Sequence, residues 1–368
     1  MAVRVLRAGQ SLTERRAFAE VAGRFLARDE AANNQQLAVL DHLSRGRMAD
    51  VEVEMLRAVP EGGGDGPDDT LSVVVRTPPY NALVCVGGTF EQREPLLADM
   101  LTRGVDLPGF NGRADDASEA AAWWAARTGR STRVAMRLGV YRLTEVSDKP
   151  RAGGVMRLVT EADRDMVLEW FDGFNEATNN ALRSPAEAWA SFNGGDFRRL
   201  YLWEVDGVPV SVAGLSGRTP NGRRIGPVYT PPEARKRGYA EALVADLCRS
   251  ILAAGSRFCF LFTDLDNPTS NHVYRDVGFH QVHYFVEVLG EPGILRRRGY
   301  QDGVAPALNG HGSSRFTVFR RLNDNGYSTP AADQAMPGAA ASGPATAGSP
   351  RSIRRWAPRR QPGATSTG

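Results

Sequence analysis

The chain has 368 residues, enough for two domains of ordinary size or for one large domain with a tail. Its composition, 42% hydrophobic and 24% charged, is typical of a folded soluble protein and excludes a wholly disordered chain. The formal net charge of +3 comes entirely from the segment 322–368. The remainder is formally neutral, which disfavours a nucleic-acid-binding protein.

The apolar segments and the cysteines predict a cytoplasmic protein. No apolar run approaches the roughly 18 residues that a membrane span requires. The first residues contain several arginines and lack the apolar core of a signal peptide. Cys85, Cys248 and Cys259 are an odd number without metal-ligand spacing, as expected of reduced thiols. We therefore expect no membrane partner and no metal, and the sequence does not indicate an oligomeric state.

Residues 1–150 are predicted to form an α/β domain without catalytic residues. No Ser/His/Asp triad, metal-ligand set or phosphate-binding loop occurs in this part, and Gly62–Gly64 lies between acidic residues. A plausible linker, Asp148–Gly154, ends it. Hydrophobic periodicity predicts helices over 14–43, 90–103 and 117–127, and strands over 51–59, 71–76, 81–86 and 133–143.

Residues 151–325 are predicted to form the second domain, a central mixed sheet flanked on both faces by helices. The segment 326–368 is rich in Pro, Gly, Ala and Ser, includes a basic cluster, and is expected to be a disordered tail. The predicted strands are 155–159, 200–205, 208–215, 224–230, 257–264, 280–288 and 316–320, and the predicted helices are 163–176, 185–192, 239–253 and 268–277.

The first informative motif joins the strand 224–230 to the helix 239–253. The turn between them contains Arg235, Lys236, Arg237 and Gly238, and the helix opens with Tyr239 and the small residue Ala240. The free N–H groups and positive dipole end of a helix N-terminus bind phosphate, and glycine lets the backbone approach a ligand closely. The pattern is weak by itself in a chain so rich in arginine, glycine and alanine, and a basic surface loop explains it as well.

The strand that precedes this turn is expected to have unpaired backbone groups. Pro227 cannot donate to a sheet ladder and indicates a bulge, and Pro231 and Pro232 end the strand. An extended ligand with amide groups could therefore pair with the backbone of Val228–Thr230, as an added strand would.

The second motif is a short helix with both ends specified. Asn267 is a good N-cap, Pro268 suits the first helical position, and Gly278 suits the position after the last turn. Asn267, Asn271 and Tyr274 are spaced to share one face of this helix. A face of two amides and a phenol is unusual for a core stripe and favours contact with a ligand.

The two motifs together resemble those of the acetyl-CoA-dependent N-acetyltransferases of the GNAT superfamily, in a bacterial two-domain form. The resemblance covers residues 154–290 and implies the GNAT fold with a splayed sheet. It implies that acetyl-CoA, as co-substrate, is bound by a set of backbone and side-chain groups in the two motifs: Val228, Tyr229, Thr230, Arg235, Lys236, Arg237, Gly238, Tyr239, Ala240, Asn267 and Asn271. Asn271, at a position often occupied by alanine in the family, either contacts the cofactor or helps to start the helix.

The resemblance also assigns Tyr274 as the general acid that protonates the leaving thiolate. The general base is not indicated, because the neighbourhood in which some family members carry a carboxylate reads Arg223-Arg224-Ile225 here. Glu204, Asp264 and Glu176 are possible substitutes, with Glu176 also a candidate for contacting the acceptor. A water chain to solvent is another alternative.

We therefore predict an N-acetyltransferase that acts on the amine of a small-molecule or amino-acid-like acceptor. The alternatives are a regulatory protein that binds acyl-CoA without turnover, an interaction protein that uses the N-terminal half and tail, and an N-acyltransferase for longer acyl groups. The N-terminal half resembles the partner domain of the two-domain form only weakly, through Arg76–Tyr80 and Gly109–Gly112, and is compatible with a degenerate copy of the same fold. It lacks the phosphate-binding motif, so one active site is predicted.

Overall fold

The structure is a computed structural model that describes residues 2–46, 50–178, 184–193 and 198–291. The predicted strand at 316–320 and the predicted tail at 326–368 lie outside these residues. No helix in this part of the chain is both long and apolar enough to cross a membrane.

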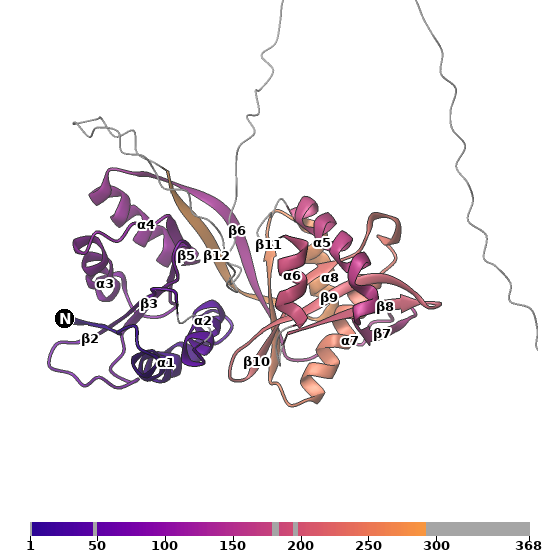
Figure 1. Cartoon of the computed structure of the whole chain (residues 1–368), viewed down its shortest axis with the longest axis horizontal. Helices are drawn as coiled ribbons and strands as arrows, with labels where there is room; N and C mark the ends of the chain where they lie inside the picture. Colours follow the sequence, from indigo (N-terminus) through magenta and orange to yellow (C-terminus); the bar gives the residue numbers. More distant parts are fainter. Residues whose placement is uncertain (1, 47–49, 179–183, 194–197, 292–368) are drawn as a thin grey trace, which may run out of the picture. The chain divides into compact units, whose positions relative to one another are not determined.

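The N-terminal half contains six strands and four main helices in the order β-α-α-β-β-β-α-β-α-β (Figure 1). Its core lies between strands β2–β5 and the helices that cover them. The elements are β1 (Val3–Arg7), α1 (Leu12–Leu26), a short 3-10 turn η1 (Ala27–Asp29), α2 (Asn34–Ser44), β2 (Glu54–Pro60), β3 (Ser72–Arg76), β4 (Ala82–Val84), α3 (Phe90–Thr102), β5 (Gly109–Arg113), α4 (Ala114–Thr128) and β6 (Ser131–Leu143).

The C-terminal half repeats this order of strands and helices. Its elements are β7 (Val155–Leu158), η2 (Glu161–Asp163), α5 (Arg164–Thr178), α6 (Pro185–Asn193), β8 (Arg199–Val205), β9 (Val208–Arg218), β10 (Gly222–Tyr229), η3 (Pro232–Ala234), α7 (Tyr239–Ala253), β11 (Phe258–Asp264), α8 (Pro268–Val277) and β12 (His280–Glu291).

The two halves exchange their last strands. All strands in the described part of the chain belong to one sheet with the order β1-β2-β3-β4-β5-β12-β6-β11-β10-β9-β8-β7. Strand β6 therefore pairs with β11 of the other half, strand β12 pairs with β5, and the exchanged strands pair with each other along their lengths (Figure 1). In each half the fourth and fifth strands are parallel. The repeated order and pairing show that the N-terminal half is a second copy of the same topology.

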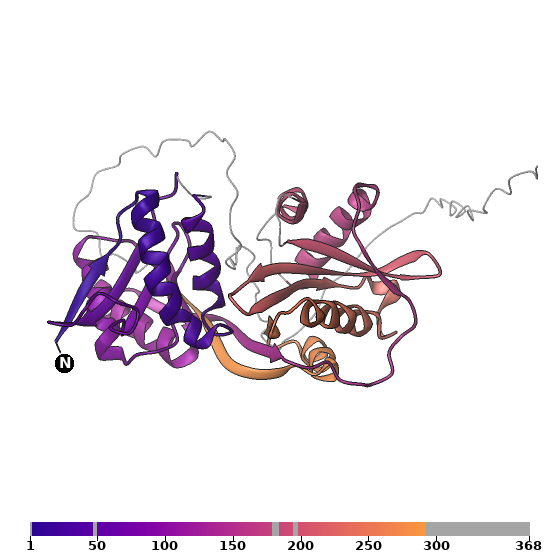
Figure 2. The ribbon, with the colours of Figure 1, turned by 90° about the horizontal axis from the view of Figure 1, so that it is seen from below.

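The helices of the C-terminal half cover opposite faces of its strands (Figure 2). Helix α7 packs on one face in a core that includes Ile225, Ala213 and Leu261. Helices α5 and α6 pack on the other face, where Trp170 and Phe192 meet Val212. Side chains alternate between the two faces along each strand, which explains why Val212 and Ala213 belong to different cores.

The predicted mixed α/β fold with helices on both faces is confirmed, and two helices match the sequence prediction without any shift, α7 and α8. The single helix predicted over 14–43 is wrong, because the chain turns between Leu26 and Asn34. There the buried Asn33 amide donates to the Leu26 carbonyl oxygen and accepts from the Val86 N–H, and the second of these is a tertiary contact that periodicity does not reveal. Strands β1 and β5 were not predicted. The sequence of β5 has the composition of a turn and therefore does not predict a strand. Gly109 is needed there for a different reason, because a Cβ at this position would lie 2.2 Å from the Val288 carbonyl oxygen.

Candidate functional site

The parallel strands β10 and β11 separate halfway along their length. Their pairing is limited to Gly222–Arg224 opposite Phe258–Phe260. Beyond that point β10 pairs only with β9, and β11 continues along β6. The register of β10 shifts on both sides of Ile225, close to Pro227. The predicted unpaired edge is thus confirmed as an opening in the sheet, with backbone polar groups of both strands directed into it.

The N-terminus of α7 lies at the end of β10 and has no side-chain cap. Its N-cap, Gly238, has φ 78°, and the Ala242 N–H donates to the Gly238 carbonyl oxygen. Within the described ranges, the backbone N–H groups of Tyr239, Ala240 and Glu241 have no hydrogen-bond partner. A Cβ at Gly238 would have room, 3.6 Å from that of Ala152, so conformation rather than space requires glycine. The arrangement can bind an anion.

The three basic residues of the turn have different surroundings. The Arg235 Nε donates to the Thr230 carbonyl oxygen at 2.9 Å, and its guanidinium carbon lies 5.6 Å from the centre of the Tyr229 ring. These contacts connect the turn to the end of β10. Lys236 and Arg237 are exposed, and Lys236 has φ 61°. Their charges face solvent beside the uncapped helix end and strengthen its attraction for anions.

Helix α8 begins and ends as its sequence predicts. The Asn267 Oδ1 accepts a hydrogen bond from the Ser270 N–H at 3.2 Å, and Pro268 occupies the first turn. Gly278 has φ 116° and ends the helix. The Asn267 side chain is therefore the N-cap, with its amide nitrogen directed away from the capping bond.

Asn271 connects α8 to the end of β11. Its side chain is 5% exposed, and its Nδ2 donates to the carbonyl oxygens of Asp264 at 3.2 Å and Leu265 at 3.3 Å. Its Oδ1 is buried without a partner in the part of the chain that the structure describes. The Asp264 carboxylate, exposed at the end of β11, accepts a hydrogen bond from the Asp266 N–H. These contacts fix the turn at the border of the opening.

Tyr274 lies against the same apolar cluster as Ile225 and Val228. Its ring meets that of Phe279 edge-on, with centroids 6.1 Å apart. Burial raises the pKa of the Tyr274 hydroxyl to about 12, because the phenolate would be poorly solvated there. No hydrogen bond to this hydroxyl occurs among the residues that the structure describes. Tyr274 is thus a protonated phenol packed against the cluster that includes Ile225 and that Val228 borders.

The other carboxylates predicted for the site lie in different places. The Glu204 Oε1 is 2.8 Å from the Arg157 Nε, and the same guanidinium also binds Asp163. Arg157 holds the pKa of Asp163 well below its usual range. Glu204 is on β8, which β9 separates from β10. The structure therefore does not bring Glu204 together with Tyr274, whereas Asp264 is at the edge where β10 and β11 end.

Glu176 is exposed in the last turn of α5. Helix α5 packs on the Tyr229 side chain. The Trp170 and Tyr229 ring centroids are 6.5 Å apart, and a Cβ at Gly173 would lie 2.3 Å from the Tyr229 hydroxyl. Glu176 follows Gly173 by three residues and so lies near this contact. The role of Gly173 was missed by sequence reasoning, since nothing local indicates which strand residue packs on it.

The corresponding strand edge in the N-terminal half is covered by side chains. The Asn33 amide accepts from the Val86 N–H and donates to the Val86 carbonyl oxygen, and the Gln36 Nε2 donates to the Val84 carbonyl oxygen. The following helix, α3, opens with a capping box of Thr89 and Gln92, in which the Thr89 N–H donates to the Gln92 Oε1. The C-terminal half has an open strand edge and an uncapped helix N-terminus. Among the described residues at the end of β4 and the start of α3, neither feature is found.

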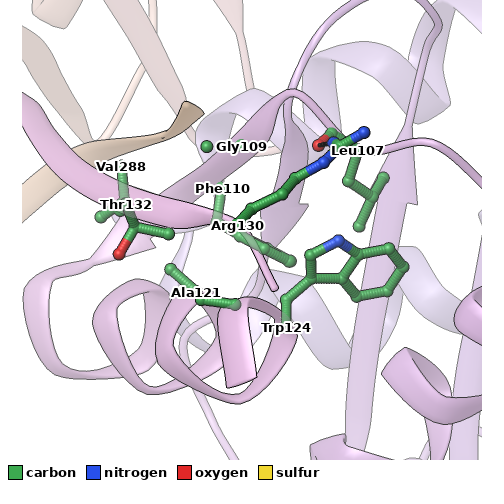
Figure 3. Close-up of a pocket in the computed structure, with 10 residues that line it drawn as sticks. Leu107, Gly109, Phe110, Ala121, Trp124, Arg130, Thr132 and Val288 are labelled. Carbon is green, nitrogen blue, oxygen red and sulfur yellow. Dashed lines mark hydrogen bonds between the residues drawn. The ribbon is translucent and has the colours of Figure 1, made fainter. Parts of the chain in front are cut away.

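A pocket of the N-terminal half lies apart from all of these residues (Figure 3). It is bordered by β5, α4 and β12, with Phe110, Trp124 and Val288 among its apolar walls and Arg130 at its edge. None of the predicted site residues lines it. No group of metal-binding side chains is found in the described ranges.

The comparisons with known proteins concern the sequence of the second half and the whole fold. Residues 164–279 match the model of the acetyltransferase (GNAT) family. A search of curated proteins finds no significant match. One similar structure is a tandem GNAT protein from the clavulanic acid biosynthesis pathway, with a TM-score of 0.49 and 15% identity over 78% of this chain and 98% of that chain. A GCN5-related N-acetyltransferase from Sphaerobacter thermophilus has a TM-score of 0.45 and 18% identity over 79% of this chain and 97% of that chain. Another from Kribbella flavida has a TM-score of 0.45 and 16% identity over 72% of this chain and 97% of that chain.

Proposed function

Because residues 164–279 form a GNAT acetyltransferase domain, we propose that the protein transfers an acetyl group from acetyl-CoA to the amine of a small-molecule or amino-acid-like acceptor. The amine attacks directly, with both substrates bound together. The observation that carries this proposal is the opening between β10 and β11 beside the uncapped N-terminus of α7. We further propose that this reaction occurs in the cytoplasm, in agreement with three buried free thiols, and that residues 1–150 take no part in the chemistry.

The binding of acetyl-CoA would use both parts of this opening. The amides of its pantetheine arm would pair with the free backbone edge of Val228–Thr230, as an added strand does. Its pyrophosphate would accept hydrogen bonds from the N–H groups around Gly238–Ala240, with the charges of Arg235–Arg237 nearby. Asn267 and Asn271 would border the arm from α8.

The transfer forms a C–N bond, breaks the thioester C–S bond, and moves one proton off the amine and another onto the thiolate. We assign the second proton to the Tyr274 hydroxyl, whose raised pKa keeps it protonated at neutral pH. Successive residues of a strand direct their N–H groups to opposite sides, so either Val228 or Tyr229 presents one toward the opening to stabilise the oxyanion. Glu176, on the helix that covers Tyr229, would contact the acceptor.

Asp264, Glu204 and Glu176 are the candidates for the base, and the surroundings favour Asp264 over Glu204. Its carboxylate is exposed at the border of the opening, whereas that of Glu204 is paired with Arg157. Asp264→Asn should therefore lower kcat by about tenfold or more, and Glu204→Gln should change it by less than about threefold. If the effects are reversed, the base is Glu204. If neither variant affects kcat, Glu176 or a water chain to solvent accepts the proton.

The proposed function is tested first by calorimetry with acetyl-CoA on the wild type and on Gly238→Asp. A carboxylate at this position would face the pyrophosphate, and we expect binding to weaken about 100-fold. Gly255→Asp is the matched control, because Gly255 also has positive φ and follows the other end of α7. Unchanged binding in Gly238→Asp would contradict the cofactor site.

Release of the CoA thiol is then measured with a panel of amines. Turnover that falls about 100-fold in Tyr274→Phe, with unchanged binding of acetyl-CoA, supports the acid role. Binding of acetyl-CoA without turnover on any amine would favour a regulatory protein. Turnover with longer acyl-CoA but not with acetyl-CoA would change the acyl group that we assign. No binding of any acyl-CoA would overturn the proposal.

A further inference from the structure

The uncapped N-terminus of α7 carries an acidic side chain in its first turn. Glu241 is the third residue of this helix and follows the N-cap, Gly238, by three positions. A carboxylate at this position can accept hydrogen bonds from the free N–H groups of its own helix end. Three other helices have a carboxylate or an amide at the same position: Glu14 in α1, Gln92 in α3 and Glu187 in α6.

In those three helices the side chain turns back and closes the helix end. The N–H of the residue before each helix donates to it: Ser11 to Glu14 at 3.2 Å, Thr89 to Gln92 at 2.9 Å and Ser184 to Glu187 at 3.1 Å. In the described part of the chain Glu241 makes no such bond, and α7 has no side-chain cap. The side chain that could close this helix end is therefore present but directed elsewhere.

Glu241 is paired instead with an arginine of the segment that joins the two halves. The Arg151 Nε lies 3.9 Å from the Glu241 Oε1, and the two side chains are 8% and 22% exposed. This distance is too long for a hydrogen bond, and among the described residues the buried Arg151 Nε has no hydrogen-bond partner. The attraction between the two groups is therefore electrostatic, and solvent screens it less than it screens a fully exposed pair.

Arg151 is itself held in place by the segment to which it belongs. Its Nη1 donates to the carbonyl oxygens of Ser147 at 3.0 Å and Lys149 at 2.8 Å, and its Nη2 donates to the Ser147 Oγ at 3.0 Å. These three hydrogen bonds use both ends of the guanidinium group. The Nε is thus left facing Glu241 in a fixed orientation.

The segment 147–154 runs from the end of α8 to the N-terminus of α7. The Ser147 N–H donates to the Val277 carbonyl oxygen in the last turn of α8. The residue after Arg151 is Ala152, whose Cβ is 3.6 Å from the place of a Cβ at Gly238. The connection between the halves therefore lies against the helix end that the proposed function assigns to the pyrophosphate.

We propose that Arg151 is a positioning residue of the acetyl-CoA site: it holds the Glu241 carboxylate away from the end of α7 and so keeps that end open for the pyrophosphate. The inference rests on the proposed function and adds a residue to it. Without the guanidinium group, the carboxylate would be drawn to the positive end of its own helix. There it would occupy N–H groups and repel the phosphates. Arg151 thus acts through Glu241 and not by touching the cofactor.

The test is a double-mutant cycle in which calorimetry measures the binding of acetyl-CoA. Arg151→Gln should weaken binding about tenfold. Glu241→Ala should bind at least as tightly as the wild type, because the competing carboxylate is gone. The double variant Arg151→Gln/Glu241→Ala should then bind within about threefold of the wild type. Lys149→Gln is the matched control, because it removes a charge from the same segment but its ion pair is with Asp276 of α8; its binding should be unchanged.

The outcomes separate this inference from the proposed function. Unchanged binding in Arg151→Gln, or a loss that persists in the double variant, would overturn the role of Arg151 and leave the acetyltransferase in place. A merely structural role of Arg151 gives the second result, since Glu241→Ala does not restore a disturbed segment. If the wild type binds no acyl-CoA, the proposed function fails. The same cycle is then measured with inorganic pyrophosphate, and equal binding by the wild type and Arg151→Gln would overturn the inference as well.

Discussion

Tyr274 combines a polar hydroxyl with apolar surroundings. A phenol whose pKa is raised by burial, to about 12, is neutral throughout the range in which the amine of an acceptor can lose its proton. It can therefore donate to a leaving thiolate without competition from its own ionisation. The same burial has a consequence for stability that is independent of catalysis.

The stability of the protein should depend on the ionisation of Tyr274 at high pH. The folded pKa lies above the value of about 10 in the unfolded chain, so the neutral phenol contributes stability below pH 10. That contribution is lost as the pH rises from about 10 to about 12. Urea unfolding at about pH 9 and pH 11.5 should show a steeper loss of unfolding free energy in the wild type than in Tyr274→Phe. Equal losses would mean that the folded protein does not shift this pKa.

Asn271 is expected to act as a structural residue. Its amide supplies hydrogen bonds to two carbonyl oxygens at the end of β11, and Asn271→Ala should lower the unfolding free energy by about 1–3 kcal/mol. The matched control is His272→Ala, because His272 is the next residue of the helix and is exposed; its effect should stay within about 0.5 kcal/mol. Urea unfolding measures both. If Asn271→Ala is stable but binds acetyl-CoA less tightly, Asn271 contacts the cofactor instead.

At the scale of elements, sequence predicts best where the determinants are local. The N-cap Asn267, the following proline and the terminal Gly278 are consecutive features of one helix, and they fix its bounds. The turn from β10 to α7 is also local, which explains why the phosphate-binding motif could be recognised. Strand β5 could not be predicted, because Gly109 is required by the backbone of Val288, far away in the chain.

The candidate site divides in the same way. Residues of the cofactor motifs are adjacent in sequence and could be proposed without a structure. The packing of Gly173 on the Tyr229 side chain joins two residues far apart in the sequence, and no spacing rule connects the two positions. Pro227 predicts the unpaired edge of β10. In the N-terminal half, Asn33 and Gln36 bind the backbone at the end of β4, and this depends on the turn before α2. The periodicity of the sequence predicts a continuous helix there and so does not indicate these contacts.

At the scale of the molecule, the chain should bind one acetyl-CoA, in its C-terminal half, although it contains two copies of the fold. Gln36 covers the end of β4 at Val84, Asn33 covers Val86 just beyond it, and α3 opens with a capping box of Thr89 and Gln92. Calorimetry should therefore give a stoichiometry of one per chain. Asn33→Ala should leave this stoichiometry unchanged, because the helix end would still be capped. Two equivalent sites in the wild type would contradict this account of the N-terminal half.

The halves are also joined by side chains. The His283 Nε2 lies 2.7 Å from the Asp29 Oδ2, and the Asn221 N–H donates to the Glu30 Oε2 at 2.8 Å. Apolar residues from both halves share one cluster, in which Ala31 and Ala32 meet Leu138, Val140 and Phe285. Thermal unfolding of the whole chain should accordingly show one cooperative transition rather than two. Two separated transitions would mean that these contacts do not couple the halves.

The exchange of β6 and β12 imposes an order on folding during protein synthesis. Strand β5 is complete early in the chain, but its partner β12 is the last strand that the structure describes. While the ribosome makes the intervening residues, the nascent N-terminal half has an unpaired strand edge in its sheet, a feature that promotes aggregation. Strand β11, in contrast, finds β6 already made. The emerging chain should therefore depend on chaperones chiefly before residue 280 leaves the ribosome.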